Sequence, residues 1–103
     1  MIIVTTDFIS GKEVETIGVV RGSMIQSKNL GKDIMSGLTS LVGGELREYS
    51  EMINEARAIA TKRMVEEATE LGADAVINLR YATSAGMQGA AEVLAYGTAV
   101  TFR

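Results

Sequence analysis

The sequence contains no cysteine and no histidine. Without cysteine the chain cannot form a disulfide. Without either residue it cannot build a Ser–His or Cys–His catalytic pair, alone or with an identical subunit, and the usual ligands of structural zinc are missing. No motif pairs another nucleophile with a base. We therefore expect a protein that is not an enzyme and that carries no cofactor.

Long hydrophobic runs and excess positive charge are also missing. The first apolar run, MIIV, is four residues long and has no basic residues before it, so it does not resemble a signal peptide. No apolar run approaches the length of a membrane span, and no basic amphipathic face suits a membrane surface. A net charge of −3 disfavours nucleic acid as a partner. These observations predict a soluble, cytoplasmic protein.

Aromatic residues make up 5% of the chain, so Ala, Val, Ile, Leu and Met must fill most of the core. A length of 103 residues predicts a single domain over 1–103. The central prediction is a long amphipathic helix over 46–71, followed by Gly72 in a left-handed C-terminal position. Its apolar residues recur at spacings of three and four: Ile53, Ala56, Ala60, Met64, Ala68 and Leu71.

Charged residues lie close to that apolar stripe. Arg57 and Glu67 project near it, and Glu67 is four residues after Arg63, so these two can pair along one face. Arg57 can pair with Glu45 of the same helix or of a neighbouring subunit. We take Glu45, Arg57, Arg63 and Glu67 as a candidate intersubunit polar cluster. The alternative is that these long side chains simply reach water from the edge of the stripe.

Four segments have the alternation and composition of β-strands. They cover 2–6, 13–26, 75–82 and 92–102, with a mobile hairpin loop over 83–91 and a shorter helix over 30–42. Gly18 and Gly22 fall on the same side of the second strand. Close approach of a ligand would explain them, but we favour close approach of a helix or a bulge.

This element order predicts an α+β fold, a two-layer split β-α-β-β sheet with the last strand between the two strands that a helical crossover joins. We expect the face with Gly18, Gly22, Ala95, Gly97 and Ala99 to receive the long helix. The opposite face would then be uncovered: Ile17, Val19, Ile25, Leu94, Tyr96, Val100 and Phe102. A large apolar face usually marks an interaction surface, so we expect a homo-oligomer.

Several segments resemble the YbjQ-like family, which is uncharacterised and sometimes labelled a heavy-metal-binding domain. They are TIGVVRG at 16–22, VGGELREYSEMINEARAIA at 42–60, GADAVINLRY at 72–81 and AYGTAV at 95–100. The resemblance implies a dodecin-subunit-like fold and a ring-shaped homo-oligomer, with five subunits as the expected number.

The metal label fits the residues poorly, because soft ions prefer thiolate, thioether or imidazole ligands. Of these the chain has only dispersed methionines. Glu45, Glu48, Glu51 and Glu55 cluster near the start of the long helix and, repeated around the axis of a ring, could hold a hard cation such as Ca²⁺. We favour the alternative, that these carboxylates provide favourable charge at a helix N-terminus and solubility. We therefore assign no metal site.

The favoured function is an oligomer that binds a small ligand or an ion between subunits, or that serves as a structural assembly. One alternative is a heavy-metal-binding protein, as the family label implies. The less favoured alternative is an enzyme with an intersubunit Glu/Arg site, in which acid–base work would fall to Glu45, Glu67, Arg80 or Tyr81.

The candidate cluster generates one prediction. If Arg57 pairs across a subunit boundary, Arg57→Ala should shift the oligomer toward smaller species in size-exclusion chromatography. An unchanged elution profile would count against this role of Arg57.

Overall fold

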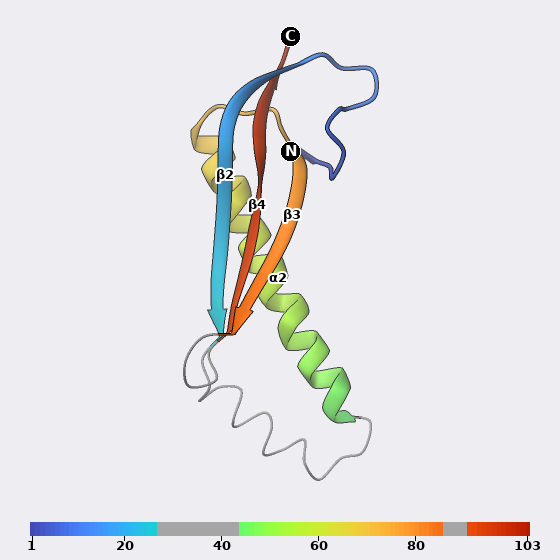
Figure 1. Cartoon of the computed structure of the whole chain (residues 1–103), viewed down its shortest axis with the longest axis vertical. Helices are drawn as coiled ribbons and strands as arrows, with labels where there is room; N and C mark the ends of the chain where they lie inside the picture. Colours follow the sequence, from blue (N-terminus) through green and yellow to red (C-terminus); the bar gives the residue numbers. More distant parts are fainter. Residues whose placement is uncertain (27–43, 86–90) are drawn as a thin grey trace.

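The computed structural model describes residues 1–26, 44–85 and 91–103. In this part of the chain, one long helix lies across one face of a four-stranded sheet (Figure 1). The elements are β1 (Ile2–Ile3), β2 (Val14–Gln26), α2 (Gly44–Glu70), β3 (Ala75–Ala85) and β4 (Ala91–Phe102). The molecule is elongated, with extents of 55 × 25 × 17 Å.

The strand order is β1-β3-β4-β2, so the last strand lies between β3 and β2 as predicted. Since β4 is antiparallel to both neighbours, β2 and β3 run parallel to one another. The α+β split arrangement is therefore confirmed. Strands β3 and β4 extend into the segment predicted as the loop 83–91, to Ala85 and from Ala91. The predicted helix over 30–42 lies outside the described residues.

Helix α2 ends as its sequence predicts. Gly72 adopts a φ of 78°, in the left-handed region that glycine enters without steric cost. The amide of Gly72 donates to the carbonyl of Thr69 at 3.0 Å, and that of Ala73 donates to Ala68 at 3.0 Å. The bond from Ala73 back to Ala68 is the one that a Schellman turn makes, and it satisfies a free carbonyl at the helix end. The chain then enters β3 directly.

The main core lies between α2 and the sheet. Ala56, Ala60, Met64 and Ala68 are fully buried along the predicted stripe of the helix. Met64 is the largest of them, and it packs in one cluster with Val20, Val76, Val93, Ala95 and Ala99 of the strands. Leu71 departs from the stripe and is 50% exposed, because α2 has already ended at Glu70.

The two glycines of β2 have different structural causes. A methyl group on Gly22 would overlap the carbonyl oxygen of Ala60 and the amide nitrogen of Met64, and would lie 2.7 Å from Cβ of Arg63. Gly22 therefore allows the helix backbone to approach the strand. Nothing lies within 4 Å of a methyl group placed on Gly18, where the pairing register of β2 with β4 shifts. Gly18 belongs to a β-bulge.

A second bulge, in β3 between Ile77 and Arg80, changes which side chains share a face. Asn78 there has a φ of 55°. The regular alternation of a strand would place Leu79 and Tyr81 on the same face as Ala75 and Ile77, but the structure does not. Leu79 packs against the cluster under α2, whereas Ala75 and Ile77 belong to a separate small core on the opposite face. An extra residue reverses the alternation of every residue after it.

The N-terminal segment covers one end of that opposite face. Val4 and Ile9 pack against the small core, which contains the fully buried Val100. The bulged backbone of β3 holds this segment, since the amides of Asn78 and Leu79 donate to Thr6 and Val4 at 2.9 and 3.0 Å. The prediction that Val100 and Phe102 are uncovered is therefore wrong: Val100 is buried and Phe102 is half-buried.

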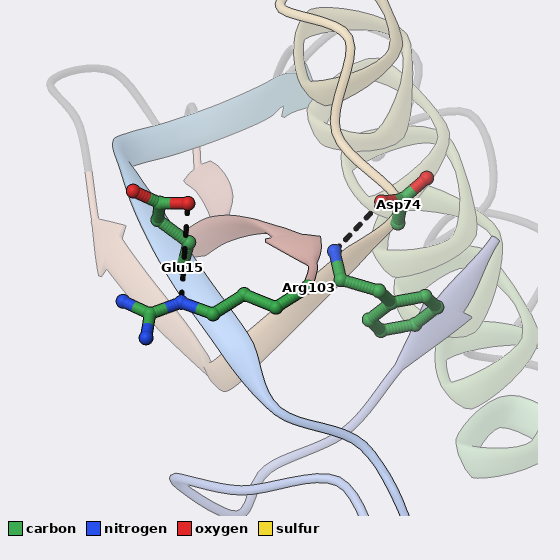
Figure 2. Close-up of polar contacts among 4 residues, drawn as sticks. Glu15, Asp74 and Arg103 are labelled. Atoms are coloured by element: carbon green, nitrogen blue, oxygen red, sulfur yellow. Dashed lines mark hydrogen bonds and ion pairs between the residues drawn. The ribbon is translucent and has the colours of Figure 1, made fainter.

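Polar contacts join neighbouring segments at the same end of the sheet (Figure 2). The carboxylate of Asp74 accepts a hydrogen bond from the amide of Phe102 at 2.8 Å, and its own amide donates to Val100 at 2.8 Å. Glu15 and Arg103 form an ion pair at 3.9 Å with both side chains well exposed, so it contributes at most about 1 kcal/mol. Asp74 therefore attaches the turn between α2 and β3 to strand β4.

The helix–strand contact generates a stability prediction. Gly22→Ala should lower the free energy of unfolding by about 3 kcal/mol, the upper part of the range for overpacking, because backbone atoms of α2 must move. Chemical denaturation would measure it. The neighbouring Ser23→Ala should change stability by less than about 0.5 kcal/mol. Equal effects of the two substitutions would contradict the close approach.

Candidate functional site

Beyond the N-terminal segment, no described element covers the sheet face turned away from α2, and we call this part the open face. Side chains of β2 and β4 leave apolar surface there, with Val19 69%, Ile25 63% and Tyr96 38% exposed. Leu94 between them is half-buried. The prediction of an uncovered apolar surface is confirmed for this part of the sheet. Large exposed side chains gathered on one sheet face are a candidate interaction surface.

A row of polar and aromatic side chains crosses the open face. Arg21 of β2 and Arg80 of β3 are both paired in register with Tyr96 of β4. Directly opposite residues in neighbouring strands lie about 5 Å apart, so the two arginines flank the tyrosine. Arg80 donates from Nη1 to the carbonyls of Thr5 and Leu79 at 3.0 and 2.8 Å. Arg21 makes no hydrogen bond or ion pair with a described residue.

Sequence reasoning missed this row. It placed Arg21 and Arg80 on strands, but the pairing of both arginines with Tyr96 follows a register shift in β2 and another in β3. Gly18 was the available signal for the first bulge. Nothing in the composition of Ile77 to Arg80 marks the second.

A second polar group lies between α2 and β3. The Thr61 hydroxyl donates its single proton to the carbonyl of Arg57 at 2.7 Å, so the Tyr81 hydroxyl must donate to Thr61 across 2.8 Å. The Arg57 guanidinium lies 5.8 Å from the centre of the Tyr81 ring and donates to Asn54 at 3.0 Å. These contacts tie the helix to the β3 side of the sheet within one chain.

The structure does not gather the four predicted cluster residues. Arg57 contacts Asn54 and Tyr81, and Arg63 donates to the carbonyl of Ser23 at 2.6 Å. Glu67 is half-buried and forms no ion pair with Arg63. Glu45 lies in α2, but its side chain is outside the description. Twelve residues of helix separate Glu45 from Arg57 by about 18 Å, so the two cannot pair within one helix. Their pairing between subunits stays a prediction.

The outer face of α2, opposite its buried stripe, is acidic. Glu51, Glu55, Glu66 and Glu70 are all exposed there, and Lys62 is the exposed basic residue among them. A shallow open depression of about 580 Å³ lies on this face, lined by Lys62, Val65, Glu66, Thr69 and Glu70. None of these glutamates forms an ion pair with a described residue, since the ion pair found among the described side chains joins Glu15 to Arg103.

The donor set does not fit a heavy metal ion. Among the described residues, no group of three His, Cys, Asp or Glu side chains could hold a metal. Thiolates and imidazoles, the ligands that soft ions prefer, are missing from the whole sequence. The four exposed glutamates on the outer face of α2 occur in two pairs about 16 Å apart along the helix, too far to share one ion. The described residues of one chain thus provide no metal centre.

A family model described as "Putative heavy-metal-binding" matches residues 1–103. The chain belongs to the YbjQ family. It is 77% identical over 100 residues to a UPF0145 protein of Clostridium novyi, covering 97% of each chain. It is 66% identical over 101 residues to a UPF0145 protein of Methanosarcina acetivorans, covering 97% of this chain and 95% of the other. Membership confirms the resemblance found in the sequence.

A solved structure shares the fold. The crystal structure of a protein of unknown function from Pediococcus pentosaceus, assigned to the DUF74 family, superposes with a TM-score of 0.70 at 20% sequence identity. The match covers 100% of this chain and 98% of that one. Within the described residues of the YbjQ chain, no helix is long and apolar enough to cross a membrane.

The Thr61–Tyr81 contact generates a prediction. Tyr81→Phe removes one hydrogen bond and should lower the free energy of unfolding by about 1 kcal/mol, measured by denaturant titration. Tyr96→Phe is the matched control, because the Tyr96 hydroxyl bonds to no described residue, and it should be neutral within about 0.5 kcal/mol. If Tyr96→Phe lowered the free energy of unfolding as much as Tyr81→Phe, the stabilising role of the Thr61–Tyr81 hydrogen bond would be contradicted.

Proposed function

We propose that the protein is a cytoplasmic homo-oligomer whose subunits associate through the open face, and that it binds a small ligand or ion between subunits or serves as a structural assembly. One observation carries this proposal: Val19 and Ile25, which neither α2 nor the N-terminal segment covers, are 69% and 63% exposed on the sheet. Shielding such a surface from water favours association.

A second copy of the chain is the partner that is always present at matching concentration. The family resemblance favours a ring, with five subunits as the proposed number. In such a ring each pair of neighbours encloses the same surfaces, so any polar side chain at the boundary is repeated around an axis. A ligand site between subunits would then draw on Arg57, Arg63, Glu67 and Glu45, the candidate intersubunit cluster.

The family description supplies an alternative, heavy-metal binding. Its support is the description alone, since the chain offers neither thiolate nor imidazole. Native mass spectrometry of protein purified without added metal separates the alternatives, because it reports subunit number and retained metal together. An enzyme with an intersubunit Glu/Arg site is the weaker alternative, and turnover that Glu67→Gln abolishes would support it.

The open face generates an assembly prediction. Sedimentation of the purified protein at micromolar concentration should give a mass several times the 11.0 kDa of one chain. Combined Val19→Ser and Ile25→Ser should raise the dissociation constant roughly 100-fold, because each substitution removes the burial of one aliphatic side chain.

Leu71→Ser is the control for these substitutions. Leu71 is 50% exposed just after the end of α2, away from the open face, so its replacement should change the dissociation constant by less than about twofold. A monomeric wild-type protein at micromolar concentration would refute the proposed function. An oligomer insensitive to the Val19 and Ile25 changes would refute the role of the open face.

A further inference from the structure

The two broad surfaces of the molecule carry opposite charge. The open face presents exposed Arg21 and Arg80 and one half-buried carboxylate, Glu92. The outer face of α2 presents four exposed glutamates and one exposed lysine, Lys62, so the net charges of the two surfaces are opposite. Because α2 lies across the other side of the sheet, these surfaces point in opposite directions from one subunit (Figure 1). A subunit with a basic face on one side and an acidic face on the other is suited to stack on its own copies.

One arginine of the open face, Arg21, has no partner for its charge among the described residues. Arg57, Arg63, Arg80 and Arg103 each hydrogen-bond or pair with a described group. Arg21, by contrast, makes no hydrogen bond or ion pair with a described residue. Two arginines separated only by Tyr96 repel one another weakly and attract a carboxylate placed above the ring.

The acidic face has both charge and a concave surface. Glu66 and Glu70 lie one helical turn apart at the rim of the depression of about 580 Å³, and Val65 and Thr69 form part of its lining. Carboxylates beside partly apolar side chains are the complement of arginines beside Val19 and Tyr96. Interfaces commonly align charge in this way to fix orientation and to reject incorrect pairings.

We propose that the open face of one subunit docks on the outer face of α2 of the next, with Arg21 and Arg80 meeting Glu66 and Glu70. This inference rests on the proposed homo-oligomer and specifies how its subunits contact one another. Contact between two open faces, or between two outer faces of α2, is disfavoured because arginines would then face arginines or glutamates would face glutamates. The contact joins two different surfaces, so it is heterologous, and heterologous contacts that close produce a ring.

Charge reversal tests the docking on the full-length chain. The pair Arg21→Glu and Arg80→Glu should raise the dissociation constant at least about 100-fold, since like charges then oppose each other across the contact. Glu66→Arg with Glu70→Arg should do the same. The protein with all four substitutions should reassemble, because its faces are complementary again with inverted sign. Sedimentation velocity at fixed salt measures all four proteins, and circular dichroism verifies that each variant is folded.

Asp7→Arg with Glu13→Arg is the matched control. It changes the net charge by the same amount as the helix pair but lies on neither surface, and it should leave the oligomer intact. A wild-type oligomer that neither reversed pair dissociates would overturn the docking and leave the oligomer proposal standing. Dissociation that the fourfold variant fails to reverse would also overturn it and point to face-to-face pairing or another occupant. A monomeric wild-type protein would instead refute the oligomer itself.

Discussion

Contact between the backbones of α2 and β2 at Gly22 sets the thickness of the molecule. The helix presents alanine at most of its buried positions, and the strand presents no side chain where the helix crosses. Large side chains are therefore needed only around Met64, which agrees with the scarcity of aromatic residues. A thin two-layer domain with one long helix covers one side of its sheet and leaves much of the other side open.

The two bulges determine what the open side displays. Before the bulge of β2, Val14 packs with Phe102 in the small core under the N-terminal segment. After it, Val20 faces α2 and Val19 faces outward. The bulge of β3 places Arg80 on the same outward side. The amides of Asn78 and Leu79 in this bulge donate hydrogen bonds to the N-terminal segment. One face is thus divided into a covered end and an exposed end by two inserted residues.

Much of this architecture follows from the sequence. The 3.6-residue periodicity and Gly72 locate α2 to within two residues at its start and one at its end, and strand alternation locates β2 and β4. The face on which each side chain lies cannot be predicted beyond a bulge, because the alternation pattern does not reveal an extra residue. Asn78, which lies in the bulge of β3, does not mark it in the sequence. The predicted charge cluster fails within one chain for another reason: helix angle places Arg57 and Glu67 near one stripe, but their contacts depend on Tyr81 and on distance along the helix.

The family description and the chemistry of the chain are reconciled most simply if function lies between subunits. A single subunit has no thiolate, imidazole or grouped carboxylates among its described residues, and its depression on α2 is open to solvent. Its unusual features are instead two outer surfaces of opposite charge. Each includes apolar side chains that are exposed to solvent in a single subunit. Repeating one heterologous contact around an axis would bury both surfaces and bring glutamate and arginine side chains from adjacent copies together. Any ligand that needs several polar groups at once would find them in that setting, and not among the described residues of one chain.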